Sequence, residues 1–303
     1  VEKAVCAAPD LSTKDEAMAA RYKAALEGLG DEGRETLRKA QRGWLKFVRT
    51  VCGPDLKESE THTRRICLTS AYDRRIEDLG KAVQRKGGYV FSRFDHYEAR
   101  KTKDAEDRWG AYPGWETRQL SFPRIDQPAN PAAKAWNRLT DERAQSAVAE
   151  WDEGQDEEIN FKINLASPVL VSVSFTNWTY PHGAAHGMWG TGGIHMLMEQ
   201  GRLLKAEDVF DRTKPWVTAL AKMCDAALRK MTQDNPEAYE GTPVKLAEMV
   251  ADPTSWEITE TGMDVVFPPY SVGPYSLSGE TEEFPWTALK PYLVAHPPVP
   301  VAR

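Results

Sequence analysis

The feature that most constrains the fold is a change of hydrophobic period at the paired glycines Gly87 and Gly88. Before them, apolar residues recur every three or four positions, which is typical of amphipathic helices. After them, apolar and polar residues alternate in several segments, which is typical of strands. The sequence therefore predicts an α+β protein, with a small three-helix domain over residues 1–88 and a larger α+β domain over residues 89–303.

Within the first domain, helices are expected over residues 11–30, 31–54 and 63–83. Ser12 followed by Asp15 is a capping signal at the first helix, and Gly53 with Pro54 ends the second. Ile66 is placed on the apolar face of the third helix. Short connections between helices make neighbours antiparallel, so the sequence predicts a helical hairpin with a third helix packed against it.

The second domain is expected to pack helices on an antiparallel sheet. Alternation predicts strands over residues 89–100, 118–125, 157–166 and 169–180, a hairpin over 192–210, and strands over 255–259 and 263–267. Helical periodicity predicts helices over residues 129–151, 214–231 and 243–250.

The cysteines suggest one disulfide. Cys52 and Cys67 stand at the two ends of a short polar segment, and a bond between them would close a 15-residue step. It would stabilise the fold by roughly 3 kcal/mol and imply an oxidising compartment. Two free thiols are the alternative. Cys224 is expected to be a buried free thiol.

The net charge of −6 is unevenly distributed. Residues 1–88 hold 18 Lys and Arg against 14 Asp and Glu, whereas residues 89–303 hold 21 against 31. The acidic part is unsuited to nucleic acid and favours basic proteins, unless its charge only keeps the chain in solution. No apolar run approaches a membrane span. Because the chain opens on Val1, we expect a removed secretory signal, although a trimmed chain would look the same.

Two histidines four residues apart, His182 and His186 in "TYPHGAAHG", raise the possibility of a metal site. Two imidazoles at that spacing bind the same metal ion only when they lie on one face of a helix, and this glycine-rich segment disfavours a helix. The glutamate of the metalloprotease signature is also missing, since Gly183 follows His182. The chain holds no nucleophile-elbow, phosphate-loop or dinucleotide motif either. We therefore expect no catalytic residue, metal or cofactor. A metal-dependent hydrolase using these histidines and His195 is an alternative.

A late segment, "FPPYSVGPYS", is better suited to binding a partner. Proline and tyrosine lose little entropy on binding, and tyrosine offers both contact area and a hydroxyl group. Its alternative role is a strand edge whose tyrosines cap the core. The predicted partner-binding residues are Tyr180, His182, His186, Tyr270, Ser271, Pro274 and Tyr275.

The first 80 residues carry a specific set of motifs: a cysteine before "DLS..D", a tyrosine, a "Q..WL…R..C" run and a final "Y..RI..L". With these motifs the segment resembles the N-terminal domain of the LprI family of secreted lysozyme inhibitors. The family usually has another cysteine just upstream, which is missing here, so the resemblance leaves Cys6 without an obvious partner. The matching residues are Cys6, Asp10, Leu11, Ser12, Asp15, Tyr22, Gln41, Trp44, Leu45, Arg49, Cys52, Cys67, Tyr72, Arg75, Ile76 and Leu79.

The second half carries "Y.GGAHG", a "G..L…D.F" run and a late "F.PY.V.PY..G", with His182 replacing the first glycine of the pair. It resembles the extracellular domain shared by RsiV and PdaC, which implies a non-catalytic ligand-binding module that faces the cell wall. The matching residues are Tyr180, Gly183, Ala185, His186, Gly187, Gly201, Leu204, Asp208, Phe210, Phe267, Pro269, Tyr270, Val272, Pro274, Tyr275 and Gly279.

Together the two resemblances imply a periplasmic or secreted binding protein that inhibits or senses a lysozyme-like glycoside hydrolase, which is a basic protein. A binder of peptidoglycan, or an immunity protein against another cell-wall toxin, is the alternative. In the case of a peptidoglycan binder, the aromatic segments "WGAYPGW" and "NWTYPHG" of this chain would stack on sugars.

Overall fold

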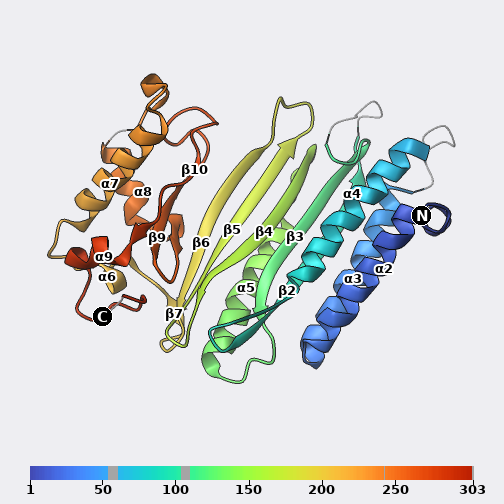
Figure 1. The fold of residues 1–303 in the computed structure, drawn as a ribbon, viewed down its shortest axis with the longest axis horizontal. Helices are drawn as coiled ribbons and strands as arrows, with labels where there is room; N and C mark the ends of the chain where they lie inside the picture. Colours follow the sequence, from blue (N-terminus) through green and yellow to red (C-terminus); the bar gives the residue numbers. More distant parts are fainter. Residues whose placement is uncertain (54–60, 104–109, 242, 302–303) are drawn as a thin grey trace. The chain divides into compact units, whose positions relative to one another are not determined.

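A computed structural model describes residues 1–53, 61–103, 110–241 and 243–301, and Figure 1 shows its elements. The described residues form two compact units. Unit 1 comprises Val1–Ile159 with Thr179–Gly187, and unit 2 comprises Asn160–Trp178 with Met188–Arg303. The boundaries of these units differ from the predicted domain boundary between residues 88 and 89. That domain boundary stays a prediction.

The elements confirm the α+β class, with a helical N-terminal region followed by strands and helices. The α-helices are α1 (Glu2–Ala7), α2 (Pro9–Glu27), α3 (Asp31–Val51), α4 (Thr61–Gly80), α5 (Pro131–Ala149), α6 (Ala206–Val209), α7 (Trp216–Met231), α8 (Pro243–Ala251) and α9 (Trp286–Leu289). The strands are β1 (Val83–Lys86), β2 (Tyr89–Lys101), β3 (Trp115–Ile125), β4 (Gln155–Ala166), β5 (Leu170–Pro181), β6 (Met188–Leu197), β7 (Arg202–Leu203), β8 (Trp256–Ile258), β9 (Gly262–Phe267), β10 (Gly279–Glu280) and β11 (Phe284–Pro285). Short 3₁₀ turns are η2 (Pro236–Ala238), η3 (Pro253–Ser255) and η4 (Lys290–Tyr292).

The larger sheet has the strand order β1-β2-β3-β4-β5-β6-β7, and the smaller one joins β8, β10 and β11 to β9. The sequence predicts an antiparallel sheet, but in the larger sheet β3 pairs with β4 in parallel. The reason is the connection between the two strands: α5 carries the chain back to the end of the sheet at which β3 starts, as in other connections between parallel neighbours. Asn130 caps α5 by accepting a hydrogen bond from the Ala133 N–H at 2.8 Å.

In unit 1 the helices α1 to α4 share one apolar core with β2 and β3, so the helical region is not packed on itself alone. Three expectations for this region are wrong. Ser12 does not cap the first helix, because α2 begins at Pro9 with Ala8 as its N-cap and without a side-chain cap bond. The third helix ends at Gly80 and not at Val83, because Val83–Lys86 form β1 and Gly87 and Gly88 close a two-residue hairpin turn with φ angles of 59° and 82°. Ile66 is 56% exposed, because α4 turns its other faces towards α2 and the sheet.

In unit 2, α7 and α8 pack against the smaller sheet. The centre of this core is aromatic: Phe210 stacks on Trp216 with ring centroids 4.5 Å apart, and Trp256 meets both rings edge-on. Cys224 on α7 is fully buried in the same core as a free thiol, as expected. This core supports the loops that connect the strands of the smaller sheet, including the loop that carries Tyr270 and Tyr275.

Candidate partner-binding site

Many motif residues of the LprI-like segment lie in the core of unit 1, whereas Cys6 and Arg49 are exposed. Tyr72 donates a hydrogen bond to Asp15 at 3.0 Å, and its ring packs edge-on against Trp44 with centroids 5.2 Å apart. Trp44, Tyr72 and Gln41 are all buried. These residues therefore hold the helices together, and contacts with a partner must come from other side chains.

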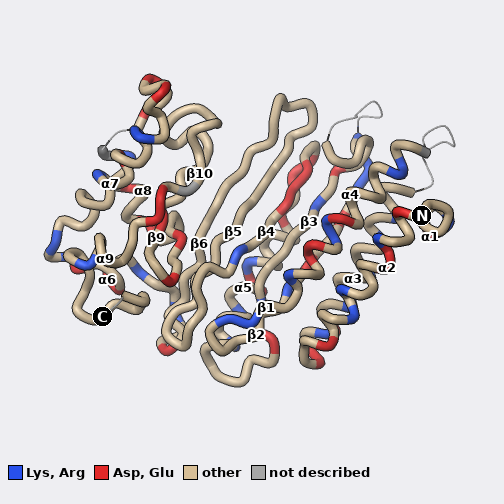
Figure 2. Tube along the Cα trace, in the orientation of Figure 1, with Lys and Arg blue, Asp and Glu red and all other residues tan. Residues whose placement is uncertain are grey.

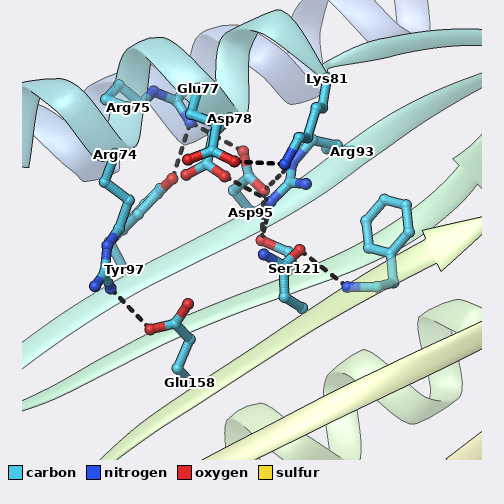
Figure 3. Close-up of polar contacts among 12 residues, drawn as sticks. Arg74, Arg75, Glu77, Asp78, Lys81, Arg93, Asp95, Tyr97, Ser121 and Glu158 are labelled. Atoms are coloured by element: carbon cyan, nitrogen blue, oxygen red, sulfur yellow. Dashed lines mark hydrogen bonds and ion pairs between the residues drawn. The ribbon is translucent and has the colours of Figure 1, made fainter. Parts of the chain in front are cut away.

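Arg75, a further motif residue, is fully buried on α4 and bonds to a strand beyond the motif segment (Figure 3). Its Nε donates to the Gln41 side chain of α3 at 3.0 Å. Its Nη1 donates to Asp95 Oδ2 at 3.0 Å and to the Tyr97 hydroxyl at 2.9 Å, both on β2. The LprI-like helices and the following strand are therefore joined by one buried polar network.

A second arginine completes this network from β2. Arg93 donates to Asp95 at 3.1 Å, to Asp78 of α4 at 3.2 Å and to Ser121 of β3 at 2.6 Å (Figure 3). Burial alone would raise the pKa of the Asp95 carboxyl, but Arg93 and Arg75 hold that pKa below its ordinary value. Asp95 is therefore a buried carboxylate whose charge is balanced by two arginines.

Asp78 differs from Asp95, because burial raises the pKa of its carboxyl from 3.8 to about 6 despite the neighbouring Arg93. The folded protein then binds a proton more tightly than the unfolded chain, so this group stabilises the fold fully below pH 3.8. That stabilisation is lost as the pH rises through about 6. We expect the free energy of unfolding, relative to Asp78→Asn, to fall by roughly 2 kcal/mol between pH 4 and pH 7.

Urea unfolding of both proteins at several pH values measures this difference. The matched control is Glu77→Gln, because Glu77 is exposed beside Lys81, which lowers the pKa of its carboxyl. The stability difference for the control should change with pH in the opposite direction. A pH-independent difference between wild type and Asp78→Asn would contradict the interpretation.

The predicted disulfide is confirmed: Cys52 and Cys67 are bonded, with their Cα atoms 5.8 Å apart. Cys52 is the C-cap of α3 and Cys67 lies in the second turn of α4, so the bond fastens the end of one helix to the start of the next. Cys6 is an exposed free cysteine.

The histidine segment is a turn in unit 1 between the end of β5 and the start of β6, not a helix, as expected from its glycines. The His182 ring is 93% buried and its Nε2 lies 3.5 Å from Asp156 Oδ1. Asp156 in turn accepts hydrogen bonds from the Thr117 N–H at 2.7 Å and hydroxyl at 2.9 Å. His182 therefore anchors the turn, whereas His186 is exposed on it.

His195 has a different environment, in unit 2. It is buried in β6, its Nδ1 lies 2.9 Å from the Ser172 hydroxyl, and its Nε2 lies 2.9 Å from the Pro253 carbonyl oxygen. Burial lowers the pKa of His195 to about 4. With both ring nitrogens engaged, this side chain is a poor metal ligand. The described residues contain no group of three or more metal-ligating side chains.

The tyrosine–proline loop, which we define as residues 268–275, lies in unit 2 between β9 and β10. Tyr270 is 54% exposed and has a φ of 64°, which is costly for a residue with a side chain. Its ring centroid lies 5.9 Å from that of Tyr275. Ser271 donates to the Pro268 carbonyl oxygen through its N–H at 3.2 Å and its hydroxyl at 2.7 Å. With Val272 fully buried beneath it, the loop presents an aromatic side chain on a fixed backbone.

An acidic segment lies beside this loop and was not recognised in the sequence. The Glu240 N–H donates to the Val272 carbonyl oxygen at 2.8 Å, which places the turn after α7 against the loop. Figure 2 shows acidic residues at this end of α7. Asp234, Glu237 and Glu240 are exposed, and none of them forms an ion pair with a described residue. The sequence shows these residues as the acidic run "QDNPEAYE". Because this run is far from the loop along the chain, the sequence does not show that the two segments lie side by side in the fold.

The predicted partner-binding residues are thus distributed over both units: Tyr180, His182 and His186 in unit 1, and Tyr270, Ser271, Pro274 and Tyr275 in unit 2. Pro274 is exposed, and Tyr180 and Tyr275 are half-buried. The role of these residues stays a prediction.

Comparisons with known proteins find matches for two segments of the chain. Residues 1–79 match the family model of lysozyme inhibitor LprI. This confirms the resemblance read from the motifs of the N-terminal segment. Residues 207–285 match a second model, described as a protein of unknown function, DUF3298. The kinship with RsiV and PdaC stays a prediction. No curated protein matches the chain.

Two solved structures show the same fold. A DUF3298 family member from Bacteroides fragilis NCTC 9343 is 15% identical, with a TM-score of 0.51 over 70% of this chain and 96% of that one. A DUF3298 family protein from Pseudomonas aeruginosa PAO1 is 13% identical, with a TM-score of 0.50 over 68% and 95%. The shared fold thus extends well beyond the 207–285 match. Among the described helices, none has the length and hydropathy that a membrane span requires.

Proposed function

We propose that this chain inhibits a lysozyme-like glycoside hydrolase by binding it, and that it carries out no chemistry of its own. The observation that carries the proposal is the match of residues 1–79 to lysozyme inhibitor LprI. An inhibitor needs a rigid surface that complements its target, not a reactive group, and the buried motif residues of this segment supply rigidity.

The tyrosine–proline loop is the surface we propose for the contact. Its exposed tyrosine stands on a fixed backbone, so little entropy is lost when a partner covers it. The adjacent Asp234, Glu237 and Glu240 add negative charge, which complements a basic hydrolase and speeds its approach. We propose Tyr180, His182 and His186 as a further contact, in which His182 holds the turn and His186 is the exposed member.

The proposal includes an extracytoplasmic location, periplasmic or secreted. The Cys52–Cys67 disulfide supports it, because such bonds persist in oxidising compartments. A lysozyme-like target supports it as well, since that enzyme acts on the cell wall.

Tyr270→Ala is expected to weaken inhibition by at least about tenfold, because an exposed aromatic anchor contributes more than about 1.4 kcal/mol to binding. The concentration giving half-inhibition in a cell-wall turbidity assay with a c-type lysozyme measures this effect. Thermal unfolding of the variant checks that the loop change leaves the fold intact.

The matched control is Leu203→Ala, which removes another exposed apolar side chain, 49% accessible, from the same unit. It should inhibit like wild type. Full hydrolase activity at micromolar wild-type protein, with c-type and other muramidases, would exclude the proposed function. Co-sedimentation with purified peptidoglycan in place of inhibition would favour the glycan-binding alternative.

A further inference from the structure

The outer edge of β2 in unit 1 is only partly covered by another strand. β1 pairs with the first four residues of β2, from Lys86↔Tyr89 to Val83↔Ser92. β2 continues to Lys101, and its other edge pairs with β3 along this whole length without a bulge. From residue 93 onwards no strand of the described chain pairs with the outer edge.

The backbone groups that point to this edge follow from the hairpin. A two-residue turn closes on a hydrogen-bonded pair, so the Tyr89 N–H and C=O point towards β1. Backbone direction alternates along a strand, so Asp95 and Tyr97 point to the same side. Consistently, the Val90 carbonyl oxygen points the other way and accepts from the Asp126 N–H at 2.7 Å. On the outer side, the Asp95 and Tyr97 backbones have no hydrogen-bond partner among the described residues.

A groove of about 590 Å³ runs beside this edge, between β2 and α3. The helix lines it with two small residues, Ala40 and Gly43, and with the longer side chains of Glu32, Glu35, Thr36 and Lys39. Outside the helix's own backbone, no atom lies within 4 Å of the position that a Cβ on Gly43 would take. From the strand side, Asp95 and His96 reach it. The helix therefore leaves room along the edge where a side chain of an added strand would lie.

The charges in the groove leave one cation unpaired. Glu32 forms an ion pair with Arg124 at 2.6 Å, and Glu35 forms one with Arg42 at 3.3 Å. Lys39, on the groove side of α3, is exposed and forms no ion pair with any residue that the structure describes. Lys39 can therefore pair with a negative side chain of a segment that lies along this edge.

We propose that the free edge of β2 accepts an extended peptide segment of a partner protein as an additional strand, with an acidic side chain opposite Lys39. Strand addition satisfies the open backbone groups of Asp95 and Tyr97 and uses the groove for alternate side chains. Because α3 flanks the edge, a single extended segment fits, whereas the equally recessed edge of a second copy does not. This inference does not rest on the proposed function.

The test uses the whole chain and three blocked seven-residue peptides of alternating threonine and valine, with glutamate, alanine or lysine at the centre. Amide hydrogen exchange is followed by NMR. In the free protein, the Asp95 and Tyr97 amides should exchange quickly. At saturating glutamate peptide their exchange should slow by at least about tenfold, because each gains a backbone acceptor. The same peptide with alternate amides N-methylated should give no protection.

Lys39→Glu should weaken binding of the glutamate peptide by about threefold and reverse the preference in favour of the lysine peptide. Lys46→Glu, an exposed position on the same helix outside the groove, is the matched control and should leave both affinities unchanged. The proposal is overturned if the Asp95 and Tyr97 amides are already protected without peptide. It is equally overturned if none of the three peptides protects them at millimolar concentration.

Discussion

Replacing Asp95 by alanine is expected to lower the free energy of unfolding by about 3–5 kcal/mol, the largest effect of any single substitution considered. The carboxylate is buried, with a side chain 2% exposed, and accepts hydrogen bonds from Arg75, Arg93 and Ser121. Its removal leaves two buried guanidinium groups short of a counter-charge. Tyr97 and Asp78 cannot replace it, since the first is neutral and the second already pairs with Arg93.

Equilibrium unfolding in urea at pH 7 measures the loss, and the control is Asp10→Ala. Asp10 forms an ion pair with Arg65 at 3.0 Å, but both side chains are more than 40% exposed, so its loss should cost less than about 1 kcal/mol. Because Asp95 joins α4 to β2 and β3, both the helical and the sheet signals should shift together in the variant. A loss below 1 kcal/mol for Asp95→Ala would show that water satisfies these arginines in place of the carboxylate.

The extent to which the fold could be predicted depended on pattern length. The long periodic runs gave α2, α3, α5 and α7, and clean alternation gave β4 and β5. Short elements were missed because four to six residues carry no readable period, as with β1 and α1. The parallel pairing of β3 with β4 was missed for another reason: strand direction is set by the path of the whole chain, which local pattern does not contain.

Burial was harder to predict than secondary structure. The helical period places Ile66 on the apolar face of its helix, yet Ile66 is exposed, since α4 packs on α2 and bonds through Arg75 to β2 with its other faces. Conversely, Arg75 is charged and yet fully buried, because Asp95 and Tyr97 come to it from a strand twenty residues away. Polar contacts of this kind depend on tertiary pairing, and composition gives no sign of them.

The candidate site shows the same limit. The exposure and fixed backbone of Tyr270 agree with the entropy argument made from its sequence. The acidic neighbours at Asp234, Glu237 and Glu240 could not be found, because roughly thirty residues separate them from the loop. The buried position of His182 also differs from what a glycine-rich loop suggests, and its cause is the remote carboxylate of Asp156.

Replacing both Cys52 and Cys67 by serine is expected to lower the free energy of unfolding by about 3 kcal/mol, since the bond spans 15 residues. The bond restricts the unfolded chain, and in the folded state it holds the start of α4 to the end of α3. Without it, α4 still packs on α2, so the fold should persist with lower stability. Urea unfolding of the variant, and of wild type with and without a thiol reductant, measures the effect.

Reduced wild type should then match the double variant, because both lack the same cross-link. Cys6→Ser is the control: its side chain is exposed and unbonded, so the change should stay within about 0.5 kcal/mol. The effect should also reach β2, because Arg75 lies two turns after Cys67 on the same helix and loses its alignment with Asp95 when that helix frays. If Asp95→Ala costs the same free energy of unfolding in reduced and in oxidised protein, the disulfide and the buried network are independent, which would contradict this coupling.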